Sequence, residues 1–103
     1  MKIKDILILK DAINDLEDGK KFYDKNEYGV GNYFWDSIIA DIESLIIYAG
    51  IHNKNYGFYR MLARRFPYFI YYEFLNEIAY VAAILPMRRD PSWIKKDLLL
   101  KKA

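Results

Sequence analysis

Residues 66–85 read Phe-Pro-Tyr-Phe-Ile-Tyr-Tyr-Glu-Phe-Leu-Asn-Glu-Ile-Ala-Tyr-Val-Ala-Ala-Ile-Leu, which is two apolar runs separated by a short polar break. A period of two in the first run predicts a strand, one face of which consists of Tyr68, Ile70, Tyr72 and Phe74. The second run, residues 78–85, is apolar on both faces and predicts the most buried strand. The break at 75–77 predicts a tight connection, and Pro86 ends the pair because proline has no N–H to donate.

One further strand and two helices are predicted upstream of these two strands. Residues 56–62 still alternate and predict a further strand, joined to the first run by a turn at 63–65. A helix is expected from Asp11, as N-cap, to about residue 26, with one apolar stripe of Ala12, Leu16, Gly19 and Tyr23. A turn at 29–31 leads to a second helix over residues 32–48, with a stripe of Phe34, Ile38, Ile42 and Leu45.

The position of Gly19 on the apolar stripe is informative, because glycine costs a helix about 1 kcal/mol relative to alanine. We therefore expect a second element to approach the first helix closely at this residue.

These elements predict an α+β fold. Residues 3–9 are apolar and β-branched and form an expected first strand, so the order is β-α-α-β-β-β. We expect a helical hairpin packed on one face of a mostly antiparallel four-stranded sheet, in a single domain spanning residues 1–103. The lysine-rich stretch after Trp93 is expected to be frayed or to need a partner for order.

Charge is distributed unevenly along the chain. Residues 1–55 carry seven lysines and ten acidic residues, a net charge of −3, whereas residues 56–103 carry nine basic and four acidic residues, a net charge of +5. All five arginines lie in the second part: Arg60, Arg64, Arg65, Arg88 and Arg89. Arginine suits a fixed grip on phosphate or carboxylate, so this cluster is a candidate surface for a polyanion or an acidic partner.

Composition excludes several classes of protein. The chain has no cysteine, so disulfides, thiolate metal sites and cysteine nucleophiles are excluded, and we expect neither a metal nor a cofactor. The longest strongly apolar run, residues 78–85, is far shorter than the ~20 residues that span a bilayer. The N-terminus lacks the pattern of a signal peptide, so a cytoplasmic protein is expected, without a membrane partner.

Four segments resemble the RelE/ParE family of bacterial toxins. Phe66-Pro67-Tyr68 with Ile70-Tyr71-Tyr72 is similar to the family's "FPY.IYY" strand, and residues 83–93, with Arg88-Arg89-Asp90-Pro91 and Trp93, to its "AILH.RRDP..W" ending. Residues 11–23 and 29–34 resemble its helical hairpin. The resemblance covers residues 5–93 and implies the toxin of a type II toxin–antitoxin (plasmid stabilisation) module, which inhibits growth and binds a cognate antitoxin.

The resemblance implies two targets. ParE-like members inhibit DNA gyrase, and RelE-like members cut mRNA on the ribosome. The catalytic residues of the RelE-like nucleases carry over poorly. Of the four basic positions, Arg60 matches one and Arg88 or Arg89 matches another, whereas Leu62 and Phe69 stand at the other two. Near the position of the catalytic tyrosine this sequence has only Trp93. The remaining catalytic candidates are His52, Arg60 and Arg89.

Binding to gyrase is therefore the leading hypothesis, with mRNA cleavage and an inactive or orphan family member as alternatives. The antitoxin is expected to lay an amphipathic segment against the hairpin or across the sheet. Its candidate anchors are four aromatic residues taken to be exposed: Tyr33, Trp35, Tyr48 and Tyr59. The C-terminal motif Arg88, Arg89, Asp90, Pro91 and Trp93 is equally compatible with a structural role, in which an arginine pairs with Asp90. Self-association through the same surfaces is left open.

Overall fold

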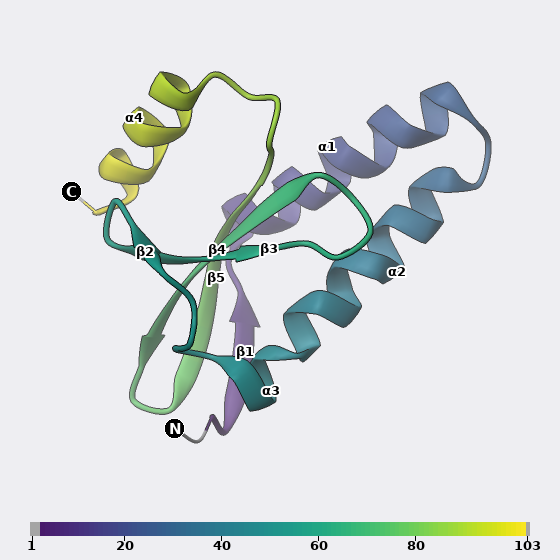
Figure 1. Ribbon diagram of the computed structural model, residues 1–103. Helices are drawn as coiled ribbons and strands as arrows, with labels where there is room; N and C mark the ends of the chain where they lie inside the picture. Colours follow the sequence, from purple (N-terminus) through teal and green to yellow (C-terminus); the bar gives the residue numbers. More distant parts are fainter. Residues whose placement is uncertain (1–2, 103) are drawn as a thin grey trace.

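The computed structural model describes residues 3–102, so both ends of the predicted 1–103 domain lie outside the described residues. Figure 1 shows its elements, which follow in the order β1 (Asp5–Ile8), α1 (Lys10–Asn26), α2 (Val30–Glu43), α3 (Leu45–Tyr48), β2 (Lys54–Asn55), β3 (Phe58–Leu62), β4 (Tyr68–Leu75), β5 (Ile78–Pro86) and α4 (Pro91–Lys102). None of the helices in this range is both long and apolar enough to cross a membrane.

The sheet is mixed and has five strands within the described residues, in the order β1-β5-β4-β3-β2. β1 runs parallel to β5, and the other neighbours are antiparallel. The expectation of four strands was wrong, because residues 54–55 form the short strand β2. The α+β class, the helical hairpin and the order of the four longer strands along the chain are confirmed.

Two-residue turns with positive φ at both positions connect two of the antiparallel strand pairs. Asn76 and Glu77 join β4 to β5 with φ of 52° and 65°, which confirms the predicted tight connection. Tyr56 and Gly57, with φ of 55° and 87°, join β2 to β3. The predicted strand at 56–62 therefore begins two residues too early, because Tyr56 and Gly57 make a hairpin turn whose twist suits antiparallel strands.

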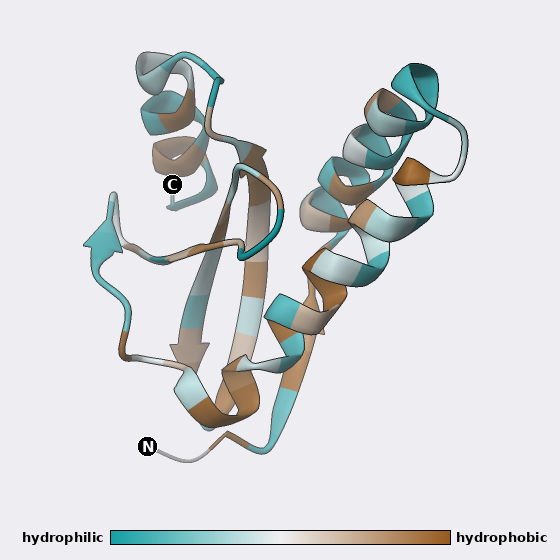
Figure 2. Ribbon diagram, turned by 45° about the vertical axis from the view of Figure 1, so that its right-hand side comes forward, coloured by the Kyte–Doolittle hydropathy of each residue, from teal (hydrophilic) through white to brown (hydrophobic). Residues whose placement is uncertain are grey.

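Helices cover both faces of the sheet. The hairpin of α1 and α2 packs on one face, and α4 packs on the other (Figures 1 and 2). We call these the hairpin face and the α4 face. Ile94 and Leu98 of α4 are buried with Phe58, Tyr71 and Leu85 of the sheet. The expectation of a frayed C-terminal tail was wrong, because this second apolar face of the sheet gives the tail a surface on which to form a helix.

A bulge in β5 matches its side chains to these two faces. Tyr71 of β4 pairs with Ala83 and Tyr72 pairs with Val81, so Ala82 has no residue opposite it. The extra residue shifts the alternation, so that Ala82 and Ala83 both contact the α4 side while Val81 and Ile84 contact the hairpin side. Residues 79 and 81–86 are all buried, as the two-faced apolar pattern predicts.

The hairpin packs closely at its glycines. A Cβ at Gly19 would lie 2.5 Å from two ring carbons of Phe34 on α2, which confirms the predicted close approach. Across the turn, the Asp24 carboxylate of α1 accepts the Gly31 N–H of α2 at 2.8 Å, and so occupies a free donor at the start of that helix.

Three predicted helix limits were wrong. α1 begins at Lys10 with Leu9 as its N-cap, and Asp11 lies in the first turn without a capping hydrogen bond. α2 begins at Val30, inside the expected turn. It ends at Glu43, because the Ser44 hydroxyl donates to the Asp41 carbonyl at 2.5 Å and competes with the helical pattern. The remaining turn of the expected helix is α3.

Gly19→Ala is expected to destabilise the protein by about 1–3 kcal/mol, because the clash with Phe34 outweighs the gain in helix propensity. Chemical denaturation measures the change, with Asn14→Ala on the exposed side of α1 as the control. Equal stability of Gly19→Ala and wild type would show that the helices do not pack this closely.

Candidate functional site

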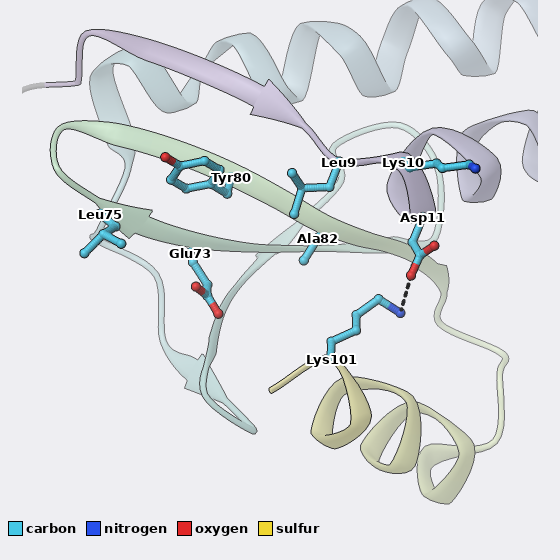
Figure 3. A pocket seen from close by; sticks show the side chains of 8 residues that line it. All are labelled: Leu9, Lys10, Asp11, Glu73, Leu75, Tyr80, Ala82 and Lys101. Atoms are coloured by element: carbon cyan, nitrogen blue, oxygen red, sulfur yellow. Dashed lines mark ion pairs between the residues drawn. The ribbon is translucent and has the colours of Figure 1, made fainter. Parts of the chain in front are cut away.

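A groove of about 630 Å³ lies on the α4 face of the sheet. Its lining, drawn in Figure 3, is Leu9, Lys10, Asp11, Glu73, Leu75, Tyr80, Ala82 and Lys101. α4 leaves this part of the sheet uncovered, so Leu9 and Leu75 are 42% and 58% exposed. An apolar floor of this kind on a soluble protein is typical of a surface that binds another molecule.

Ion pairs close the charged end of this groove. The Lys101 amine of α4 lies 2.8 Å from the carboxylate of Asp97 on the same helix. It also lies 3.6 Å from the Asp11 carboxylate of α1, and Figure 3 marks this second pair. Lys102 pairs with Glu73 of β4. These pairs engage Asp11, Glu73 and Lys101, and the exposed lining of the groove is mostly apolar.

A second cavity, of about 210 Å³, brings Arg60 and Arg89 together on the α4 face. Its lining is Asn55, Tyr56, Arg60, Phe69, Tyr71, Met87, Arg89, Pro91 and Ile94. The Arg60 guanidinium lies 4.6 Å from the centre of the Phe69 ring, and the Arg89 guanidinium lies 4.1 Å from that of Trp93. We call this the Arg60–Arg89 cavity. Two stacked guanidinium groups beside phenol hydroxyls are suited to holding an anion.

Proton transfer has little support in the Arg60–Arg89 cavity. Burial raises the pKa of Tyr71, and the nearby Arg60 guanidinium only partly offsets this rise. The Tyr71 phenol therefore keeps its proton at neutral pH and is not available as a base. No carboxylate, histidine or lysine is among the described residues that line the cavity. The cavity is better suited to binding an anion than to general acid–base chemistry.

The other three arginines lie elsewhere. Arg64 and Arg65 are exposed in the β3–β4 turn, which the Asp41 carboxylate holds by accepting the Arg64 N–H at 3.0 Å. The Arg88 guanidinium lies 4.2 Å from the ring centre of Phe22 on α1, and Arg88 lines a cavity of about 180 Å³ beside that helix. The five arginines thus do not converge on one site, and only Arg60 and Arg89 share the cavity on the α4 face.

The third catalytic candidate, His52, is separated from Arg89. His52 lines a cavity of about 440 Å³ together with Arg60 and four other residues. Its Nδ1 lies 2.5 Å from the Tyr72 hydroxyl, which also accepts the Gly50 N–H at 2.9 Å. The tautomer of His52 decides which of these two groups donates, and in either tautomer Nδ1 is engaged by the phenol. Burial lowers the pKa of His52 and so favours the neutral ring.

The aromatic anchors and the C-terminal motif required correction. Tyr33 and Tyr48 are exposed, but Trp35 and Tyr59 are half-buried against the main core. Neither arginine of the motif pairs with Asp90 within the described residues. Asp90 instead accepts the backbone N–H and the hydroxyl of Ser92, at 3.0 and 2.8 Å, at the start of α4. These two bonds lower the pKa of Asp90.

One acidic residue was missed as a site. Asp15 of α1 accepts the Ile84 N–H of β5 at 2.9 Å. Burial raises its pKa to about 6, partly offset by this bond and by Lys101. Since its partner is a backbone group 69 residues away, no motif in the sequence marks it. Tyr71 was missed as well, although the register of β3 and β4 places it opposite Arg60.

The comparisons with known proteins add one decisive likeness. No protein-family model and no curated relative matches the sequence. Among solved structures, a chain of the chromosomal ParDE TA system from P. aeruginosa matches with a TM-score of 0.75 over 84% of this chain and 98% of that chain. The fold is RelE/ParE-like. Sequence identity is 12%, so the likeness carries the fold and assigns no role to individual residues. Within the described residues no group of three potential metal ligands was found.

Asp15→Asn is expected to stabilise the protein above pH 6 by about 1–2 kcal/mol, a value discounted for partial solvent screening. A carboxyl whose pKa is raised on folding destabilises the folded state when it is charged, so the advantage should shrink as pH falls through about 6 and vanish near pH 4. Denaturation midpoints from pH 4 to 8 measure it. Glu17→Gln, on the exposed side of α1, controls for loss of a charge, and a difference that does not vary with pH would contradict the assignment.

Proposed function

We propose that the chain is the toxin of a type II toxin–antitoxin module, and that it inhibits growth by binding its target without cutting RNA. DNA gyrase is the target that the ParE-like resemblance implies. The observation that carries this proposal is the Arg60–Arg89 cavity, which has two anion-binding groups and no general base. The RelE/ParE-like fold, shared with a chain of a ParDE system, supports the same class of protein.

The role proposed for Arg60 and Arg89 is contact with the target. Both side chains are ordered by stacking on aromatic rings, so little side-chain entropy is lost when they bind. Their partner on the target is an acidic surface or a DNA phosphate.

A second candidate function, ribosome-dependent cleavage of mRNA, is favoured by the same cavity. Two arginines could stabilise the charge that develops on a phosphate, and Tyr56 and Tyr71 are the available proton carriers. The cavity has no carboxylate, histidine or lysine among the described residues that line it, so no base for the 2′-hydroxyl is at hand and we place this function second.

The antitoxin is proposed to cover the groove of Figure 3. An amphipathic segment laid across the sheet beside α4 would bury Leu9, Leu75 and Tyr80, which the folded chain leaves as an apolar floor. Tyr33 and Tyr48 lie outside this lining, so they serve as anchors only if the segment continues onto the helices. Such a protein works in the cytoplasm as a single toxin domain, with the antitoxin and the target as its partners.

Induction of the chain alone in bacteria is expected to lower DNA synthesis before protein synthesis, as measured by pulse labelling. With purified gyrase, the chain should reduce supercoiling, and Arg60→Ala/Arg89→Ala should raise the inhibitory concentration at least ~10-fold, equivalent to about 1.4 kcal/mol of lost binding. Lys95→Ala/Lys96→Ala on exposed positions of α4 removes the same charge and should change little.

Protein synthesis that falls first would contradict this proposal. Defined cuts in translated mRNA that disappear in Arg60→Ala/Arg89→Ala would establish the second candidate instead. If neither synthesis falls, the chain shares only the fold of the toxins.

Leu75→Asp is expected to weaken neutralisation in a strain that coexpresses the small protein encoded beside this chain, because a charge would be placed in the apolar floor of the groove. Leu75 is 58% exposed, so folding should survive. Colony growth gives the readout, and Leu100→Asp, at an exposed position of α4 outside the groove, is the control. Full neutralisation of Leu75→Asp would place the antitoxin elsewhere.

A further inference from the structure

Strand β3 loses its outer neighbour halfway along its length. β2 pairs with it only at Lys54 with Tyr59 and at Asn55 with Phe58. One more bond follows, in which the Arg60 N–H donates to the Asn53 carbonyl at 2.9 Å. The ladder with β4 nevertheless continues to Leu62. The end of β3 is therefore the edge of the sheet.

The backbone of Leu62 points to this free edge. The Ala63 N–H donates to the carbonyl of Tyr68, the first residue of β4. The Arg60 N–H points the other way and donates to the Asn53 carbonyl beside β2. Because successive residues of a strand alternate between their two neighbours, Leu62 has the same direction as Arg60. No β2 residue lies opposite Leu62 in the described ladder, so its N–H and C=O are available to a further strand.

A hollow of about 440 Å³ occupies the place of the missing strand. It is lined by Ile51, His52, Asn53, Arg60, Met61 and Leu62. Ile51 is 70% exposed and Leu62 is 56% exposed, so apolar side chains stand on both sides of it. A strand docked here would cover apolar surface while it completes the ladder.

The wall of this hollow is held in place before any partner arrives. The buried Tyr72 hydroxyl bonds both the Gly50 N–H and His52 Nδ1, so two points of the α3–β2 loop are fixed to β4. A preformed wall lowers the ordering cost of binding.

The charges near the hollow select the partner's chemistry. Lys54 begins β2, and Arg64 and Arg65 follow β3, whereas none of the residues that line the hollow is acidic. From these observations we propose that the free edge of β3 binds an extended peptide segment of a partner protein, apolar along its length and bearing an acidic residue. The segment adds a strand beside Leu62. This site lies at the edge of the sheet away from the groove of Figure 3. Arg60 also lines the Arg60–Arg89 cavity, so the test uses Ile51 and Leu62, which lie outside that cavity.

The test pans a phage library of random seven-residue peptides on the complete folded chain. We expect enriched sequences with alternating β-branched residues and an Asp or Glu. Titration of the best synthetic peptide should show at least ~10-fold weaker binding to Ile51→Asp and to Leu62→Pro, which lacks the edge N–H. Leu99→Asp on α4 should bind like wild type. Circular dichroism checks folding, and Ile51→Asp keeps the test valid if Leu62→Pro does not fold.

Amide hydrogen exchange gives a second readout. The Leu62 amide should exchange freely in the free chain and become protected at least ~10-fold with the peptide, whereas the Met61 amide, which faces β4, should be protected in both. Absence of enriched peptides, binding that Ile51→Asp does not weaken, or a Leu62 amide already protected in the free chain would overturn the proposal.

Discussion

Strand β5 carries apolar side chains on both of its faces, and such a strand must be covered from both sides. The hairpin covers one face through Leu16, Phe34 and Ile38, and α4 covers the other through Ile94 and Leu98. The bulge at Ala82 adjusts the side chains of β5 to these two unequal layers. α4 is shorter than the sheet is wide, so part of the α4 face stays open and becomes the groove of Figure 3.

The same arrangement explains why the functional surfaces are separate. Arg89 reaches the α4 face because the chain turns there from β5 into α4, and Arg60 reaches it from the neighbouring strand pair. Arg88, one residue earlier, stacks on Phe22 of α1, whereas Arg89 stacks on Trp93 of α4. Both arginines line the small cavity beside α1, but only Arg89 also reaches the Arg60–Arg89 cavity.

The strands and the hairpin could be predicted because their signals are local: a period of two, a period near 3.6, and Gly19 on an apolar stripe. What failed was decided elsewhere in the chain. α4 has lysines and leucines that look like a loose tail, and it forms a helix because Phe58 and Tyr71 leave a second apolar face to cover. β2 is too short to carry a pattern of its own. The partners of Asp15 and His52 are a backbone group and a phenol from distant strands. These contacts could therefore be identified only in the folded structure.

The parallel pairing of β1 with β5 also sets the order in which the protein can be assembled during translation. β1 pairs with residues 78–81, and Asp15 bonds residue 84, so β5 is made after both of the strands that it joins. At about 5–20 residues per second, the interval between β1 and β5 is about 4–15 seconds. The sheet cannot close before the second half of the chain has left the ribosome. A nascent chain that ends before β5 has neither the groove nor the Arg60–Arg89 cavity, and any activity that depends on them begins only after residues 9–101 have been made.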